Sequence, residues 1–228
     1  MDMTEEQQLW QVRATTCEML AFSLRYPAPE LAEALENGEW ADAAREIAGV
    51  LDAALPEAFG EALTENAAGE AQSGDTLFHT LRAEATRLFI GAPEAACSPY
   101  EGVWRAADDG VQALLFVNPH SMDVERFMKK CGLGRPEGTN EPLDHIATEF
   151  ELLQVLAAWA AGIAEPEEGT VTLDALPGGS AQAAYAQFID EHMNTWADRF
   201  AEKLQADSRL PYYRSAGMLV QALLPVLK

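Results

Sequence analysis

Apolar residues recur every three or four positions along most of this chain, which is the spacing of one face of an α-helix. The strict alternation typical of a half-buried β-strand is nearly missing. We therefore expect helices over the ranges 4–25, 30–36, 40–54, 76–90, 122–131, 181–206 and 210–227. The range 57–75 is rich in Ala, Gly and Glu and predicts a short helix and a mobile acidic loop.

A further long helix is expected to begin at Pro142. Proline is tolerated in the first helical turn, where its missing N–H has no partner, and Asn140 or Glu141 can cap the turn. An apolar stripe runs along the following residues and is widened on one side, so most of this helix should be buried. The stripe consists of Leu143, Ile146, Phe150, Leu153 and Ala157, and it is widened by Leu152, Leu156, Trp159 and Ile163.

The start of this helix brings together side chains that usually occur apart. Glu141, Pro142, Asp144 and His145 lie within five positions, and Glu149 follows one helical turn later. Residues four apart share a helix face, so His145 and Glu149 should be neighbours. The positive end of the helix dipole favours the carboxylates there. The pattern predicts a ligand site at this helix start.

A second unusual segment covers residues 91–110. Its prolines and glycines break the helical pattern, yet it carries the aromatic residues Tyr100 and Trp104. Aromatic side chains in an irregular segment either fill a core or line a binding site. The residues alone leave both interpretations open.

The pattern as a whole predicts an all-α protein, a bundle of about ten helices around a single-layered core. A polar linker at residues 134–140 separates an N-terminal helical part, 1–133, from a C-terminal part, 141–228. Such a linker is a natural hinge, and it would permit exchange of the C-terminal helices between two chains. We expect a monomer or a domain-swapped dimer.

Composition narrows the class of partner. The formal net charge of −22 argues against nucleic acid, because phosphate binding requires clustered Lys and Arg. The acidity serves either a cationic partner or solubility alone.

No apolar run is long enough for a membrane span, and no basic segment leads into an apolar one at the N-terminus, so we expect a cytoplasmic protein without stable membrane insertion. The three cysteines have no metal or redox spacing and are expected to be free and buried.

Motifs for catalysis are largely missing. The chain has no Gly-Lys pair for a phosphate loop and no Gly-x-Ser-x-Gly elbow. A carboxylate-bridged metal site would need Glu and His on two helices, and no second helix repeats the pattern. We expect no catalytic residues and no metal. The alternative is a metal- or nucleotide-dependent enzyme that uses Asp144, His145 and Glu149.

Two separated motifs resemble the TorD/DmsD/NarJ family of redox-enzyme maturation chaperones. Residues 141–145 match its E-P-x-D-H signature, and residues 98–104 look like its segment P-Y-E-S-V-Y. The family serine is Gly102 here, and the final tyrosine is Trp104. The helical order also agrees, so the resemblance covers most of the chain.

This resemblance implies an all-helical cytoplasmic protein that binds the twin-arginine signal peptide of a molybdenum-cofactor oxidoreductase subunit, such as a DMSO or TMAO reductase. It would hold the precursor until the cofactor is inserted and then release it for export. No cofactor of its own is expected, although weak GTP binding is reported for some family members. The residues for such binding are unknown.

Carried over to this sequence, the resemblance predicts a peptide-binding set. The set consists of Leu88, Phe89, Pro99, Tyr100, Glu101, Trp104, Glu141, Pro142, Asp144, His145 and Glu149. The apolar members would form a groove, and Glu101, Asp144 and Glu149 would face the arginines of the leader. His145 would brace the hinge, touch the peptide, or release it on protonation near neutral pH. These three roles remain open.

Overall fold

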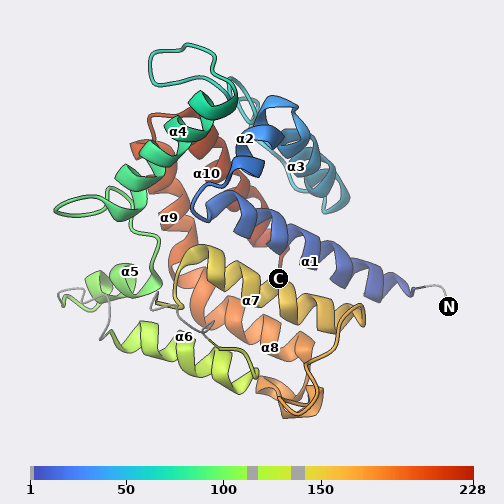
Figure 1. Cartoon of the computed structure of the whole chain (residues 1–228). Helices are drawn as coiled ribbons and strands as arrows, with labels where there is room; N and C mark the ends of the chain where they lie inside the picture. The colour runs from blue at the N-terminus through green and yellow to red at the C-terminus, as the bar shows by residue number, and fades with distance from the viewer. Residues whose placement is uncertain (1–2, 112–117, 135–141) are drawn as a thin grey trace. The chain divides into compact units, whose positions relative to one another are not determined.

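The computed structural model describes residues 3–111, 118–134 and 142–228, and within them it shows helices and no β-strand beyond isolated bridges (Figure 1). The expected all-α class is confirmed. The helices are α1 (Glu5–Leu24), α2 (Pro29–Glu36), α3 (Glu39–Val50), α4 (Gly74–Ala85), α5 (Glu101–Asp108), α6 (Pro119–Lys130), α7 (Ile146–Ala161), α8 (Ala181–Phe188), α9 (Asn194–Asp207) and α10 (Pro211–Leu223). None of the described helices is long and apolar enough to cross a membrane.

The chain folds into two compact units that are discontinuous in sequence. Unit 1 comprises Met1–Ala21, Tyr100–Trp196 and Lys228, and unit 2 comprises Phe22–Pro99 and Ala197–Leu227. These units differ from the division into 1–133 and 141–228. The linker 134–140 falls inside the range of unit 1, and apart from Gly134 it lies outside the described residues. The hinge therefore stays a prediction.

The core of unit 1 is built on α7, which is apolar on several sides. Helix α8 packs along α7, and α5 packs on α6 (Figure 1). Aromatic rings join elements that are distant in sequence, because the Trp10 and Tyr185 ring centroids lie 5.1 Å apart and those of Phe127 and Phe188 also lie 5.1 Å apart. Phe150, in the second turn of α7, is fully buried. The apolar stripe predicted for this helix is buried except for Ile163, which follows the end of α7 and is 52% exposed.

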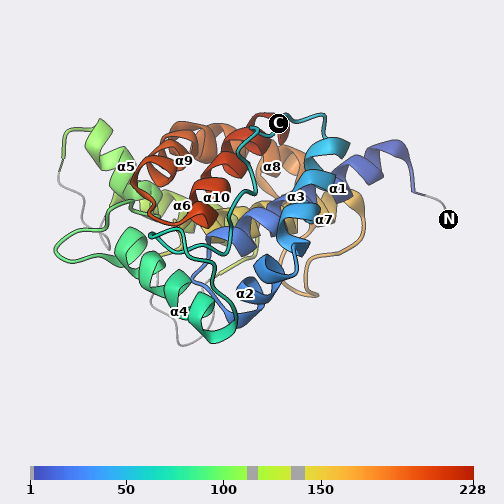
Figure 2. The same ribbon diagram turned by 90° about the horizontal axis from the view of Figure 1, so that it is seen from above.

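The core of unit 2 is also aromatic. The buried ring of Trp40 contacts Tyr212, with centroids 5.3 Å apart. The Tyr213 hydroxyl donates to the Leu81 carbonyl at 3.1 Å, so this buried polar group is satisfied. Helices α9 and α10 lie side by side (Figure 2), and Gly217 permits this approach because a Cβ there would lie 2.7 Å from the Ala201 carbonyl oxygen.

The three cysteines are free and buried, as expected. Burial raises the pKa of Cys17 and of Cys97 to about 12 and that of Cys131 to about 11. These thiols stay protonated at neutral pH and are therefore poor nucleophiles.

Two local predictions are wrong, and a third is confirmed with one irregular turn. The segment 91–110, expected to be irregular, contains the helix α5. Residues 57–75 form turns and no short helix before α4 begins. The helix 181–206 is interrupted by the π-helical turn Ile189–Met193 between α8 and α9. Such turns insert one residue and often occur at functional sites.

The start of α7 is also shifted. The helix begins at Ile146, and His145 is its N-cap, whereas a start at Pro142 was expected. The Asp144 carbonyl accepts a hydrogen bond from the Glu101 amide, a contact with a distant segment that draws residues before His145 out of the helix. Asn140 and Glu141, either of which was expected to cap the helix, lie outside the described residues.

Candidate functional site

The two motif segments meet inside unit 1. The Glu101 amide donates to the Asp144 carbonyl at 2.9 Å, and Tyr100 and His145 form an isolated antiparallel bridge. The rings of Tyr100 and His145 pack edge to face, with centroids 5.4 Å apart. The start of α5 and the start of α7 are therefore joined through both backbone and side chains.

Asp144 is fully buried at this junction and organises the start of α5. Its Oδ2 accepts hydrogen bonds from the Gly102 amide at 2.8 Å and from the Ser121 hydroxyl at 2.6 Å. The Asn118 side-chain amide donates to the Gly102 carbonyl at 2.5 Å, and Asn118 also caps α6. One carboxylate thus links α5, α6 and the segment before α7.

Gly102 stands where the resemblance places a serine, and the structure gives a reason. A Cβ at this position would overlap the Ser121 hydroxyl and lie 2.9 Å from Asp144 Oδ2. The hydroxyl that donates to Asp144 in this chain comes from Ser121 on α6. The glycine therefore makes room for a hydroxyl supplied by another helix.

Gly102→Ser is expected to lower the free energy of unfolding by about 1–3 kcal/mol, since it forces a side chain into an occupied space. Adding Ser121→Ala should recover much of that loss, because it removes the overlapping hydroxyl while the new serine donates to Asp144. Urea unfolding of the two single variants and the double variant measures this coupling. Additive losses would show that the two positions do not share one space.

Glu101 is buried and fully engaged. Its Oε1 accepts from Arg105 Nη1 at 2.8 Å, and its Oε2 lies 2.9 Å from His192 Nδ1. Arg105 also donates to the Thr195 hydroxyl at 3.0 Å. The His192 ring stacks on Phe188 with centroids 4.6 Å apart. The π-helical turn Ile189–Met193 carries His192, so this irregular turn supplies one partner of Glu101.

Glu149 completes a cluster of three buried carboxyl groups. Its Oε2 accepts from the Trp196 indole at 3.3 Å, and its Oε1 has no hydrogen-bond partner among the described residues. Burial raises the pKa of Glu149 well above its usual range, and the nearby charges of Glu101 and Asp144 raise it further. Burial also raises the pKa of Asp144. This environment favours the protonated form of Glu149.

His145 braces the start of α7. Its Nδ1 accepts the Ala147 amide at 3.1 Å, which requires a ring nitrogen without a proton. Burial lowers the pKa of His145 to about 4, so the ring is neutral at physiological pH. Of the three roles considered, the brace fits this geometry. The lowered pKa disfavours protonation of His145 near neutral pH, because desolvation opposes the charged form.

The sequence-predicted residues divide by exposure. Tyr100, Trp104, Pro142 and His145 are half-buried and retain some surface. The three acids are not at the surface, because Glu101, Asp144 and Glu149 are each 0% exposed. Direct contact of these acids with the arginines of the leader therefore stays a prediction, and it would require their exposure. Hydrogen bonds permit the burial of Glu101 and Asp144, and the Arg105 guanidinium also compensates the charge of Glu101. For Glu149, the raised pKa favours the neutral form.

The remaining apolar members belong to unit 2. Leu88, Phe89 and Pro99 are buried there, and Phe89 packs edge to face on Tyr213 with centroids 5.7 Å apart. A place in the core explains why these positions are apolar. Their proposed contact with a peptide stays a prediction, as does that of Glu141.

Sequence reasoning missed several residues of the cluster. Ser121, Asn118 and His192 carry no sequence signal that marks them as members of this cluster. Arg105 follows Glu101 by four positions, a helical ion-pair spacing that could have pointed to α5. The contact between His192 and Glu101 spans 91 positions, and no local pattern signals it.

The structure offers little for metal chemistry. Among the described residues, no group of three or more His, Cys, Asp and Glu side chains is arranged to hold a metal ion. The two motif segments that carry the family resemblance are thus joined through buried polar groups, and comparisons with known proteins test that resemblance.

The model of the family described as "Nitrate reductase delta subunit" matches residues 37–202 of this chain. The chain belongs to this family, and the resemblance to the TorD/DmsD/NarJ group is confirmed. The chain is similar to proteins named "Chaperone protein TorD". One, from Vibrio cholerae serotype O1, is 28% identical over 62% of this chain and 58% of its own length. Another, from Photobacterium profundum, is 25% identical over 62% of this chain and 59% of its own length.

The match thus spans less than two thirds of these curated relatives. These relatives carry the name of a chaperone. The alternative of an enzyme built on Asp144, His145 and Glu149 gains no support, since two of these side chains are buried and His145 caps a helix.

Proposed function

We propose that this chain is a system-specific chaperone that binds the twin-arginine leader of a molybdenum-cofactor oxidoreductase subunit. It acts in the cytoplasm, keeps the precursor until the cofactor is inserted, and then releases it for export. The names of the relatives and the family match support the chaperone class. The leader, the client and the cofactor step rest on the family resemblance.

The junction of the two motif segments carries this proposal. It holds Tyr100, Trp104, Pro142 and His145, which keep part of their apolar and aromatic surface accessible. Residues that are half-buried on a rigid support are suited to bind a ligand, because little ordering is needed when it arrives. We assign the apolar part of the leader to this surface.

Estimates of the binding free energy indicate which contacts determine the affinity for the leader. Burial of about 400 Å² of apolar peptide surface yields on the order of 10 kcal/mol before costs. Loss of translational and rotational freedom removes roughly 4–15 kcal/mol. Exposed ion pairs add only about 0–1 kcal/mol each, so apolar contacts set affinity and charges set selection and encounter rate.

The buried acids have a positioning role in this proposal. Asp144 holds the start of α5 through the Gly102 amide, and Glu101 ties α5 to His192. Both therefore fix the backbone that presents Tyr100 and Trp104. They act on the leader through these residues rather than by direct contact with its arginines.

Isothermal titration calorimetry with a synthetic leader peptide tests the proposed function. The peptide carries two adjacent arginines followed by an apolar stretch, and the control peptide has both arginines replaced by glutamine. We expect saturable binding of the first peptide and clearly weaker binding of the second. Absence of binding to the first peptide would contradict the proposed function.

A further inference from the structure

Unit 1 contains a hollow that lies outside the two motif segments. A groove of about 720 Å³ runs along α7, beside the residues that follow α6. This volume lies in the range of sites that bind small ligands or peptide side chains. Its described lining consists of Gly132, Leu133, Gly134, Glu151, Gln154, Val155, Ala158, Trp159, Ala164, Glu165, Glu167 and Thr170.

The groove has an apolar floor with acidic groups around it. Leu133, Val155, Ala158 and Trp159 supply apolar surface, and Val155 and Ala158 share a face of α7 because they are three positions apart. Val155 and Ala158 are half-buried, so part of this surface is accessible. It is therefore an apolar surface that a ligand can reach without local unfolding.

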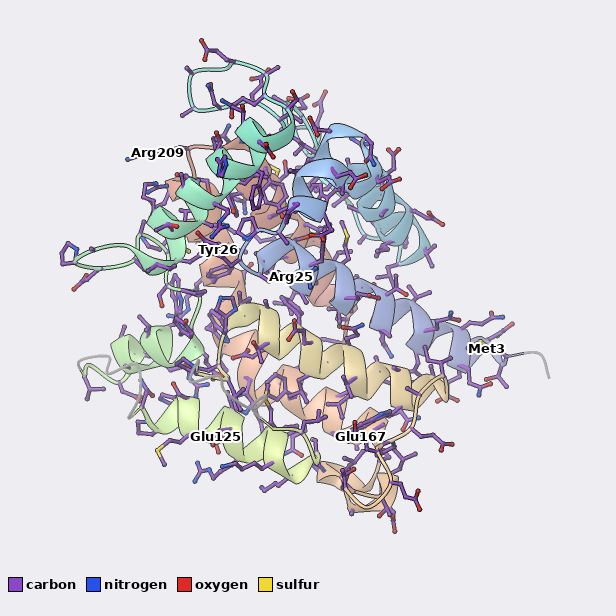
Figure 3. The ribbon with its side chains drawn as sticks, in the orientation of Figure 1. Met3, Arg25, Tyr26, Glu125, Glu167 and Arg209 are labelled. Carbon is purple, nitrogen blue, oxygen red and sulfur yellow. The ribbon has the colours of Figure 1, made fainter. Side chains whose placement is uncertain are left out.

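Among the described lining residues, the accessible charges have one sign. Glu165 and Glu167 are exposed carboxylates, and the described lining carries no basic side chain. Glu167 lies on the connection that follows α7 (Figure 3). A low-dielectric floor beside like charges concentrates the field, so an oppositely charged ligand is attracted and an anionic one is repelled.

We propose that this groove binds the arginine-bearing end of the client leader and the apolar side chains next to it, while the rest of the apolar part lies on the junction of the two motif segments. This inference extends the proposed function and rests on it. The three motif acids are buried and cannot meet arginine side chains at the surface. Glu165 and Glu167 offer accessible carboxylates beside apolar surface, which is the combination that a basic and apolar peptide requires.

A second copy of this chain fits the groove less well than such a peptide. Each copy has a formal net charge of −22, so two copies repel each other at long range. The acids around the groove would add to that repulsion, because a partner surface would need basic groups opposite them. Charge complementarity thus selects a cationic occupant.

A matched pair of charge reversals tests the acidic side of the groove. Glu167→Lys changes a lining residue, and Glu168→Lys makes the same change at the next exposed position, which does not line the groove. The probe is a fluorescein-labelled synthetic peptide with two adjacent arginines and an apolar stretch. We expect Glu167→Lys to weaken its binding about 5-fold or more at low salt, and Glu168→Lys to change it less than about 2-fold.

Ala158→Phe tests the floor, because the larger side chain would fill accessible space. We expect it to weaken peptide binding about 10-fold without lowering the midpoint of thermal unfolding. If both lining variants bind the peptide as the wild type does while Trp104→Ala binds it poorly, the groove proposal fails and the proposed function stands. If the wild type does not bind the peptide, the proposed function fails and the groove proposal with it.

Lining variants that change only the sedimentation coefficient would identify a second copy as occupant and would also overturn the groove proposal.

Discussion

Glu149→Ala is expected to lower the free energy of unfolding by about 2–4 kcal/mol. The substitution leaves a cavity beside α7 and removes the acceptor of the Trp196 indole N–H. Glu149→Gln is expected to cost less than about 1 kcal/mol, because the amide has nearly the shape of the protonated acid and its oxygen still accepts from Trp196. Urea unfolding at pH 6 with circular dichroism compares the two variants.

The same two variants also test how the free energy of unfolding changes with pH. Burial and the charges of Glu101 and Asp144 raise the pKa of Glu149 in the folded state. A raised pKa means that the folded state retains a proton that the unfolded state releases, so stability is lost as pH rises from the unfolded pKa through the folded one. The wild type should therefore lose more stability than Glu149→Gln between pH 5 and pH 8. Equal losses would show that Glu149 is ionised in the folded protein.

Trp104→Ala is expected to weaken binding of the leader peptide about 10- to 100-fold. Trp104 is a half-buried aromatic residue on α5, and such residues contribute most of the binding free energy at interfaces when they are covered by a partner. Calorimetry measures the change in the dissociation constant. Tyr26→Ala is the control, since Tyr26 is an exposed aromatic residue of unit 2 at 41% exposure.

A larger loss from single acids than from Trp104 at physiological salt would contradict this division of roles. Asp144 and Glu101 variants must be compared at equal stability, because both acids support the start of α5. Thermal unfolding of each variant in parallel with calorimetry separates an effect on folding from an effect on contact with the leader.

Much of the fold was predictable because helical periodicity is strong in this chain. The first helix was expected at 4–25 and is α1, Glu5–Leu24. Helix α5 escaped prediction because it has only eight residues and follows a segment rich in proline and glycine. Its first amide is satisfied by the Asp144 carbonyl, a tertiary contact that no local pattern reveals.

The sequence predicted which residues belong to the site better than it predicted their burial and their hydrogen-bond partners. The motifs identified Tyr100, Glu101, Asp144 and His145, which do lie together. The motifs did not indicate that the acids are buried, because Asp and Glu are almost never fully buried unless they are paired. The partners that permit burial come from elsewhere in the sequence, and His192 in a π-helical turn is the clearest example.

Hydrogen–deuterium exchange of the wild-type protein, with and without the synthetic twin-arginine leader peptide, tests the central claim most directly. We expect the leader to slow exchange in the segments that carry Tyr100 to Trp104 and Pro142 to Ala147. Protection should extend along α7 from Glu151 to Trp159 if the groove is occupied. Binding of the leader with protection confined to unit 2 would contradict a leader site at the junction of the two motif segments.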